Sequence, residues 1–357
     1  MDKRVFYRRD CRHFKGFLPC KPHKLYGVHC EGCEHYEKAG SRILIIKLGA
    51  IGDVIRTTPL LRKLRETEPN AEIWWLSQSP EILPEQIDKI LKYDLDSIIL
   101  LQNTKFDKVY NLDKDLNACA LASSVETKDL FGFTLKDGKP SPANELAEHK
   151  YLTGIFDDLN KENTKSYPRE IFELCGYEYN GEEYLLEYQS EKDWNLQNGR
   201  NKIIGLNTGC GDRWVSRLWS EDNWAELAVE LRKEGYYPVL LGGKQEHERN
   251  LRISEMSGVL YPGYFPLNDF ISLVDQCDGV VTAVTMAMHL AIGLKKQLIL
   301  FNNIFNPHEF ELFGRGEIVQ PQKECKCFFS PKCTNEEYFC MDHLTVGQIL
   351  EAVKRHL

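Results

Sequence analysis

A short apolar strand that runs directly into a glycine turn and a helix constrains this chain most strongly. Residues 42–47 read RILIIK, Gly49 and Gly52 follow, and residues 53–66 form an amphipathic stretch. Parallel strands need a crossover connection, which a helix usually supplies. The unit therefore predicts an α/β fold that contains a parallel sheet.

The same alternation continues through both halves of the chain. In the first half we expect further strands at 72–76, 97–101 and 108–112. A second series begins with a strand at 202–206 and continues with helices at 221–234, 245–257, 268–276, 285–293 and 345–356 and strands at 237–241, 279–282 and 297–301. This pattern predicts two doubly wound, Rossmann-like domains.

Polar, loop-forming composition marks the divisions between these parts. The run 136–145 predicts a loop by its Gly and Pro content, and residues 177–201 are polar and weakly periodic. We expect a Cys-rich module at 1–40, an N-terminal domain at 41–195 and a C-terminal domain at 196–357.

Charge and hydropathy exclude two classes of protein. The formal net charge of −8 argues against nucleic acid as a partner, because binding to phosphates needs clustered Lys and Arg. The longest nearly apolar run, 279–294, is shorter than the roughly 20 residues that span a bilayer. The N-terminus lacks the apolar core of a secretory signal, so we expect a cytoplasmic protein.

Residues 47–59, KLGAIGDVIRTTP, form the first motif with possible chemistry. Gly49 and Gly52 allow a tight turn that brings backbone amides close to a ligand, and Asp53 stands at the helix start. Asp53 is a candidate base, although an acid here also commonly caps a helix or complements its dipole. The spacing lacks the G-x-G-x-x-G fingerprint of a nicotinamide-dependent oxidoreductase.

Three further motifs follow strands of the second half. Residues 207–224 contain Thr208 and Arg217, and Ser220 is placed to cap a helix. Residues 240–250 carry Glu246 beyond a Gly-Gly turn, either for a ribose or as a dipole-complementing acid. In residues 280–303 a helix starts near Thr285 and can receive an anion, while His289 is a ligand or a core residue.

The four motifs, in this order over roughly residues 42–357, resemble those of glycosyltransferase family 9, the ADP-heptose:lipopolysaccharide heptosyltransferases. The resemblance implies a GT-B fold, in which the two domains face each other across a cleft. It also implies an inverting, metal-independent transfer of a sugar, with heptose favoured, from a nucleotide diphosphate to an acceptor hydroxyl. In the family the residue that matches Asp53 is the general base.

The resemblance also assigns the other residues. Acceptor-side residues are Gly49, Gly52 and Arg56, although Arg56 also reads as an exposed helix residue; donor-binding residues are Thr208, Arg217, Glu246, Thr285, Met286 and His289. The sequence departs from the family pattern at Ser220, which replaces a proline, and at Val284 and Met286, which replace Asp and Gly.

The same resemblance implies the partners. ADP-heptose is the favoured donor, and the acceptor is a glycan, a lipid-linked molecule or a protein. The acceptor would bind to residues 41–195 and the nucleotide sugar to residues 196–357. A lipid-linked acceptor would bring the protein into peripheral contact with the inner face of the cytoplasmic membrane.

Two clusters of cysteines lie outside these motifs. Cys11, Cys20, Cys30 and Cys33 have potential metal-ligand spacing, which indicates structural zinc, with iron, an iron–sulfur centre, free thiols or disulfides as alternatives. Cys325, Cys327, Cys333 and Cys340 form a second cluster, which is either a separate metal knot, part of one shared site or a stabiliser of the fold. If the chain is a glycosyltransferase, we expect catalysis to need no cofactor. The alternative function is a redox or metal-sensing protein that uses the cysteine clusters on the same scaffold.

Overall fold

A computed structural model describes residues 6–196 and 201–357 of the chain. The chain divides into two compact units. The first comprises Met1–Leu48, Leu60–Pro80 and Glu85–Ala147, and the second comprises Gly49–Pro59, Glu81–Pro84 and Glu148–Leu357. The glycine turn with Asp53 therefore belongs to the second unit, with the C-terminal sheet, whereas the strand before it belongs to the first.

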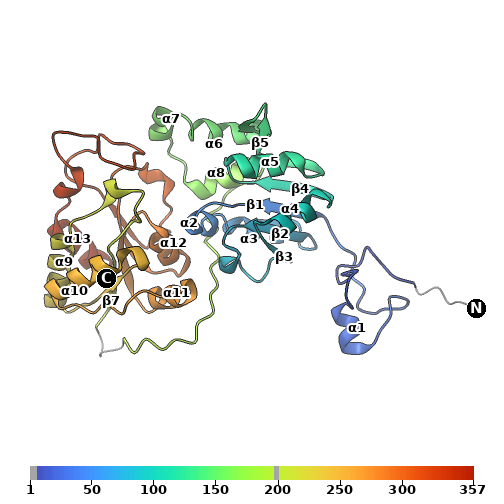
Figure 1. Ribbon diagram of the computed structural model, residues 1–357, viewed down its shortest axis with the longest axis horizontal. Coiled ribbons are helices and arrows are strands. Elements are labelled where there is room, and N and C mark those ends of the chain that lie inside the picture. Colours follow the sequence, from blue (N-terminus) through green and yellow to red (C-terminus); the bar gives the residue numbers. More distant parts are fainter. Residues whose placement is uncertain (1–5, 197–200) are drawn as a thin grey trace, which may run out of the picture. The chain divides into compact units, whose positions relative to one another are not determined.

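The first unit is built on a six-stranded sheet with the order β3-β2-β1-β4-β5-β6 (Figure 1). Its strands are β1 (Arg42–Ile46), β2 (Glu72–Ser77), β3 (Lys89–Lys92), β4 (Phe106–Asn111), β5 (Thr127–Lys136) and β6 (Lys139–Pro142). All neighbours pair in parallel except β5 and β6. The expected strands at 42–47, 72–76 and 108–112 are thus confirmed.

The expected strand at 97–101 is wrong, because these residues lie in helix α4 (Leu95–Gln102). The Asp94 side chain accepts a hydrogen bond from the Ser97 backbone N–H at 2.9 Å, which caps the start of a helix. Leu101 of α4 packs on one face of the sheet with Leu44 and with α5 (Leu116–Ser124). An apolar run of this length fits either a strand or a half-buried helix.

Two other local expectations also need correction. Residues 136–145 are not simply a loop, because β5 and β6 form a hairpin through Asp137 (φ 50°) and Gly138 (φ 73°), the left-handed pair that tight hairpin turns require. The helix expected at 53–66 is broken into α2 (Ile51–Ile55) and α3 (Pro59–Thr67). Pro59 cannot donate to the preceding turn, so the first helix ends before it.

The second unit contains a five-stranded parallel sheet with the order β11-β10-β9-β7-β8. Its strands are β7 (Ile203–Asn207), β8 (Tyr237–Leu241), β9 (Gly279–Ala283), β10 (Gln297–Phe301) and β11 (Gly316–Val319). In Figure 1, α9 (Glu221–Lys233), α10 (His247–Ser257) and α13 (Val346–His356) lie on one side of it, and α11 (Leu267–Asp275) and α12 (Met286–Gly293) lie on the other. Every helix expected in this half is confirmed within two residues.

Aromatic side chains lie in the hydrophobic core beside this second sheet. Trp219 and Trp224 are fully buried against Phe301, with ring centroids 5.2 and 5.3 Å away from it. The Ser220 hydroxyl between them accepts from the Asn223 N–H at 3.1 Å and caps α9, as predicted.

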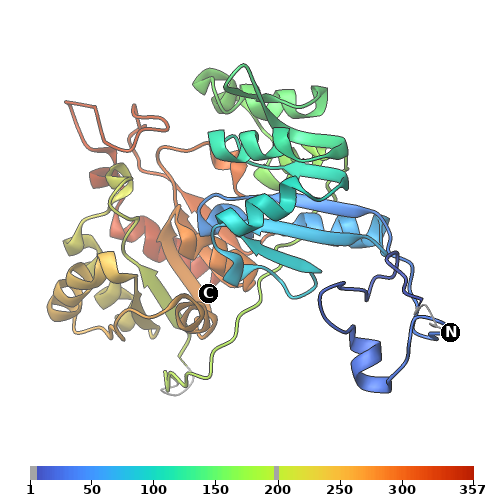
Figure 2. The same ribbon diagram turned by 45° about the vertical axis from the view of Figure 1, so that its right-hand side comes forward.

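The remaining segments contain little regular structure. Along the chain, α6 (Glu148–Leu152), α7 (Asp157–Glu162) and α8 (Tyr167–Leu174) follow the first sheet, and the stretch 177–196 has no helix or strand. The expected domain boundary near residue 195 lies inside the second unit, which contains Glu148–Leu357. Figure 2 shows the N-terminal segment as loops around the short helix α1 (Lys21–Tyr26). In the described part of the chain no helix is long and apolar enough to cross a membrane.

Candidate active site

Three loops of the second unit meet at the carboxyl ends of β7, β8 and β9. The chain leaves β7 toward β8 on one side and later returns to β9 on the other, so β7 and β9 flank the switch point of the sheet. Ligands of open α/β sheets bind at such points, outside the carboxyl ends of the strands. Four predicted donor-binding residues, Thr208, Arg217, Glu246 and Thr285, lie on these loops.

A hydroxyl and amide network fixes the start of α12. The Asn207 side-chain amide donates to Thr282 Oγ1 at 2.9 Å and to Thr285 Oγ1 at 3.3 Å, and the two hydroxyls lie 3.0 Å apart. Thr285 is the N-cap residue of α12, but its side chain makes no capping bond. The first N–H groups of α12 therefore remain available to an anion.

Glu246 joins the loops that follow β7 and β8. Its carboxylate accepts from the Gly243 N–H at 3.0 Å and from the Gly211 N–H at 3.3 Å. A Cβ at Gly209 would collide with the Glu246 side chain, so this loop needs glycine at that position. Beneath it, Thr208 is buried and donates to the Asn250 side chain. Glu246 thus holds the loops that surround the proposed ribose position.

Arg217 is buried beside the start of α12. One guanidinium nitrogen, Nη1, donates to the Val284 carbonyl, and Nη2 donates to the Cys210 carbonyl at 3.3 Å. Burial lowers the pKa of Arg217 from its ordinary value. Arg213, which is exposed on the same loop, lies against the Trp214 ring. The guanidinium of Arg217, and not that of Arg213, therefore contacts the turn between β9 and α12.

A second group of charges surrounds α2. Arg56 Nη2 lies 2.7 Å from Asp53 Oδ1, and Arg56 Nη1 lies 3.8 Å from Glu309 Oε2. The guanidinium also stacks 3.4 Å from the centroid of the Tyr167 ring. Burial opposes the charge of Arg56, yet Asp53 and Glu309 raise its pKa above the ordinary value. Arg56 is thus not the exposed helix residue that the sequence allowed.

Asp53 itself remains accessible. Its side chain keeps 38% of its exposure, against 15% for Arg56. The N-cap residue of α2 is Ala50, so Asp53 does not cap this helix, although it lies in the first turn, where a carboxylate complements the dipole. The Asp53 carboxylate and the Arg56 guanidinium form an ion pair at 2.7 Å.

His289 packs α12 against α2. A Cβ at Gly52 would collide with Cδ2 of His289, so glycine allows the close approach of the two helices. Burial lowers the pKa of His289 to about 3; Arg56 lowers it further and Asp53 opposes this. His289 Nδ1 has no hydrogen-bond partner in the described structure. His289 is therefore a neutral, packed residue of the α2 group, and Met286 begins α12 half-buried.

Several contributors could not be singled out from the sequence. Glu309 and Tyr167 reach Arg56 from segments far along the chain, and Asn250 reaches Thr208 from α10. In the first unit, Lys47 and Asp113 form a buried ion pair at the carboxyl ends of β1 and β4, the switch point of that sheet. The sequence signal for this pair was the position of each charged residue at the end of an apolar strand.

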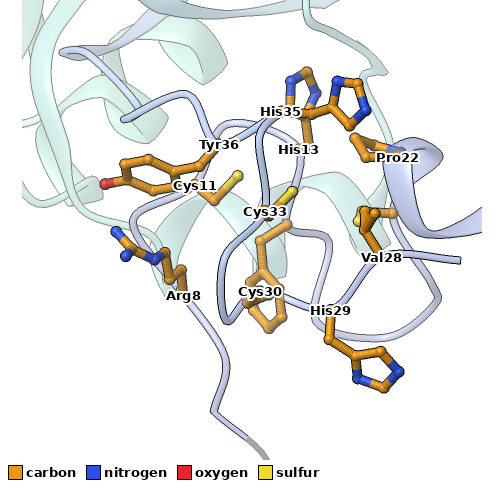
Figure 3. Close-up of a pocket in the computed structure, with 12 residues that line it drawn as sticks. Arg8, Cys11, His13, Pro22, Val28, His29, Cys30, Cys33, His35 and Tyr36 are labelled. Carbon is orange, nitrogen blue, oxygen red and sulfur yellow. The ribbon is translucent and has the colours of Figure 1, made fainter. Parts of the chain in front are cut away.

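All four N-terminal cysteines line one pocket in the first unit, together with His13, His29 and His35. Figure 3 shows this pocket. The cysteines are half-buried and none forms a disulfide. Nevertheless, no group of three or more His, Cys, Asp or Glu side chains in residues 6–196 and 201–357 is arranged to hold a metal ion.

The second cysteine cluster forms two thiol pairs before α13. Cys327 Sγ and Cys333 Sγ lie 3.6 Å apart. A hydrogen bond with Cys325 lowers the pKa of Cys340 to about 6; burial opposes this and the Asn303 amide assists it. Of the four other cysteines, Cys119, Cys175 and Cys277 are buried and Cys210 is half-buried.

Two α/β domains built on largely parallel sheets define a GT-B-like α/β protein, and solved structures agree. A glycosyltransferase family 9 protein from Veillonella parvula aligns over 89% of this chain and 97% of its own, with a TM-score of 0.69 at 17% identity. The ADP-heptose lipopolysaccharide heptosyltransferase II of E. coli aligns over 88% and 98%, with a TM-score of 0.65 at 19% identity. The predicted fold class is confirmed.

The sequence comparison identifies the family. The profile of glycosyltransferase family 9 (heptosyltransferase) matches residues 99–338, which is more than half of the chain. Lipopolysaccharide heptosyltransferase 2 of Salmonella typhimurium is 24% identical over 290 residues, covering 72% of this chain and 81% of the relative. The chain belongs to glycosyltransferase family 9 and is a glycosyltransferase, as the four motifs predicted.

Proposed function

We propose that this protein transfers a heptose from ADP-heptose to a hydroxyl of a lipopolysaccharide core glycan, with inversion at the anomeric carbon. The family match supports sugar transfer, and the names of its similar proteins support the heptose and the lipopolysaccharide. The acceptor would bind to residues 41–195 and the nucleotide sugar to residues 196–357. Because this acceptor is lipid-linked, the enzyme would work at the inner face of the cytoplasmic membrane.

The observation that carries the mechanism is the Asp53–Arg56–Glu309 group. Asp53 is exposed enough to meet an acceptor, and Arg56 holds its carboxylate in an ion pair and lies 3.8 Å from Glu309. The acceptor oxygen attacks the anomeric carbon and forms the new C–O bond, while its proton passes to the Asp53 carboxylate. The bond from the anomeric carbon to the diphosphate oxygen breaks, and the nucleotide diphosphate leaves with the electron pair.

The start of α12 is the proposed binding site of the leaving diphosphate. Negative charge grows on this group during the transfer, and helix N–H groups aimed at it lower the barrier. The buried cation of Arg217 lies beside the same turn, and the Thr285 hydroxyl and the Met286 N–H lie at its start. Glu246 would accept hydrogen bonds from ribose hydroxyls, and Thr208 would support the loop that Glu246 contacts. His289 supports the donor site by packing within α12.

On the acceptor side, the turn at Gly49 and the start of α2, which contains Gly52, would present backbone close to the sugar. Arg56 acts through Asp53 by orienting its carboxylate. Catalysis in this proposal requires no resident cofactor, since a carboxylate base and a cationic donor site supply the proton transfer and the charge stabilisation.

Calorimetric titration and a transfer assay test this proposal together. ADP and ADP-heptose, but not GDP or UDP, should bind the wild type and the Asp53→Asn variant with similar affinity. Transfer to a lipopolysaccharide core acceptor should fall roughly 10²–10⁴-fold in Asp53→Asn, because the base is lost while the donor site remains. NMR of the product should show the anomeric configuration opposite to that of the donor.

Matched variants separate chemistry from folding. Asp222 is an exposed acid in the first turn of α9, so Asp222→Asn should leave transfer unchanged. Arg217→Ala should weaken transfer by roughly 10²–10³-fold, whereas Arg213→Ala on the same loop should change it little. Full transfer by Asp53→Asn would exclude Asp53 as the base, and binding of none of the nucleotides would exclude the donor assignment.

The 3.6 Å contact between Cys327 and Cys333 supports one alternative function, a thiol redox sensor on the same scaffold. Oxidation would join the two sulfurs as both thiols lose a proton and an electron, and glutathione disulfide would be reduced to two glutathione molecules. Treatment with glutathione disulfide, followed by peptide mass spectrometry, tests this function. A Cys327–Cys333 disulfide that changes the transfer rate reversibly would favour the sensor; unchanged thiols would exclude it.

A further inference from the structure

The N-terminal segment lacks the core that would hold it in one conformation. Within residues 6–40 only Pro22 is buried, and the only regular element is the six-residue helix α1. Six large apolar side chains in it are exposed: Phe6, Tyr7, Phe17, Leu18, Leu25 and Tyr26. A segment this small needs a disulfide, a metal or a partner to be stable, because it cannot bury enough apolar surface.

The chain nevertheless gathers its four cysteines around one pocket. Cys11 pairs with Lys38 in an isolated bridge, and Cys20 directly precedes α1. Cys30 and Cys33 flank Gly32, whose φ of 74° bends the backbone between them. Three turns separated in sequence thus bring sulfur atoms to the same pocket. In Figure 3 the side chains of Cys11 and Cys33 point toward the same space.

The histidines of the segment are engaged elsewhere. His23 Nδ1 lies 2.9 Å from the Val28 carbonyl, and the His29 ring packs edge-on against His23 at 5.3 Å. The His35 ring stacks on Tyr26 at 4.5 Å, and His13 Nε2 lies 3.6 Å from Glu37. Figure 3 shows the His29 ring pointing away from the cysteines. Of the potential ligands that line the pocket, the four thiols are therefore the proposed set, and four sulfurs form a closed tetrahedral zinc site.

The surrounding charge favours such a site. Residues 6–40 contain seven Lys and Arg against four Asp and Glu, a net charge of +3 in a chain of −8 overall. One zinc ion with four thiolates carries a charge of −2, which these cations offset. Arg8 lines the pocket itself, with its guanidinium 4.2 Å from the centroid of the Tyr36 ring.

We propose that Cys11, Cys20, Cys30 and Cys33 bind one zinc ion as a tetrathiolate, which replaces the missing core of residues 6–40. In the structure as described, no three potential ligands stand close enough together to hold an ion. Binding therefore requires the turns to close inward, and the free energy of metal binding drives this closure. The site is structural and separate from the residues proposed for transfer.

Metal analysis of the purified full-length protein tests the proposal. We expect one zinc per chain by elemental analysis, and a cobalt-loaded protein with thiolate-to-cobalt charge-transfer absorption. Cys30→Ser and Cys33→Ser should each lose the zinc. His29→Ala should retain the zinc, because the His29 ring points away from the cysteines. The double variant Cys327→Ser/Cys333→Ser should also retain the zinc, because it changes the second cysteine cluster.

Three outcomes would overturn the assignment: iron in place of zinc, disulfides among the four cysteines without bound metal, or zinc that persists in Cys30→Ser and Cys33→Ser. As a control, circular dichroism should show that each variant keeps its two α/β domains. Limited proteolysis gives a second readout, since chelation should speed cleavage within residues 6–40 at least tenfold and leave residues 42–357 unaffected. Equal cleavage with and without metal would also contradict the proposal.

Discussion

Single buried charges in this protein depend on partners from distant segments. The Lys47–Asp113 pair is almost completely buried at the end of β1. Asp113→Asn should lower the free energy of unfolding by roughly 3–5 kcal/mol, because it leaves a buried ammonium without its countercharge. Denaturant unfolding measures this effect. In the exposed Lys105–Glu126 pair, at 2.6 Å, Glu126→Gln should cost less than about 1 kcal/mol, and equal losses would refute the argument.

His289 should make stability depend on pH. Its pKa is about 3 in the folded chain, lowered by burial from 6.5, with Arg56, Asp53 and Tyr184 around it. Between these values the unfolded chain binds a proton that the folded chain does not, so stability is full above pH 6.5 and falls as the pH drops toward 3. The free energy of unfolding should fall between pH 7 and pH 4 in both proteins. The fall should be about 3 kcal/mol larger in the wild type than in His289→Gln. Identical pH slopes would show that His289 binds its proton equally well in the folded and unfolded chains.

At the scale of elements, the contribution of helix caps to stability can be tested by the same Ser→Ala substitution at two helix starts. The Ser220 hydroxyl caps α9, whereas Ser166 occupies the N-cap position of α8 without a side-chain capping bond. Ser220→Ala should cost about 1 kcal/mol in unfolding free energy, and Ser166→Ala should cost much less. Thermal and urea denaturation of both variants provide the measurement. A larger loss at Ser166 would contradict the assigned caps.

The elements also show where local sequence signals compete. Residues 97–101 contain apolar side chains suited to a strand, yet Asp94 begins a helix there. Conversely, the Gly- and Pro-rich run at 136–145 contains the turn of a hairpin as well as a loop. Caps and positive-φ turns act over two or three residues, so they can override the hydrophobic pattern of a longer window.

At the scale of the whole molecule, the N-terminal module should be dispensable for folding. No strand of the first sheet comes from residues 6–40, and the Arg12–Asp88 ion pair at 2.7 Å joins the module to Asp88, which Arg65 also binds. A chain that lacks residues 1–39 should keep a cooperative thermal transition within about 4 °C of the wild type. Circular dichroism melting checks this. Loss of cooperativity would show that the module is part of the core of the first unit.

The sequence by itself determined the alternation of strands and helices and the four motifs of the family. These signals are local, because a buried strand or helix face must repeat with its own backbone period. For the same reason the sequence alone is enough to single out Asp53 and the turn that precedes α12. Ser220 could likewise be identified as a cap, since its partner lies three residues away.

Only the tertiary structure decided which of these residues meet. The contacts of Arg56 with Glu309 and Tyr167, and of Gly52 with His289, join segments that lie far apart in sequence. Burial and ion pairing depend on such long-range packing, which no local pattern encodes. The sequence therefore specified the candidate base, and the packing of α2 within the second unit determined its cation and exposure.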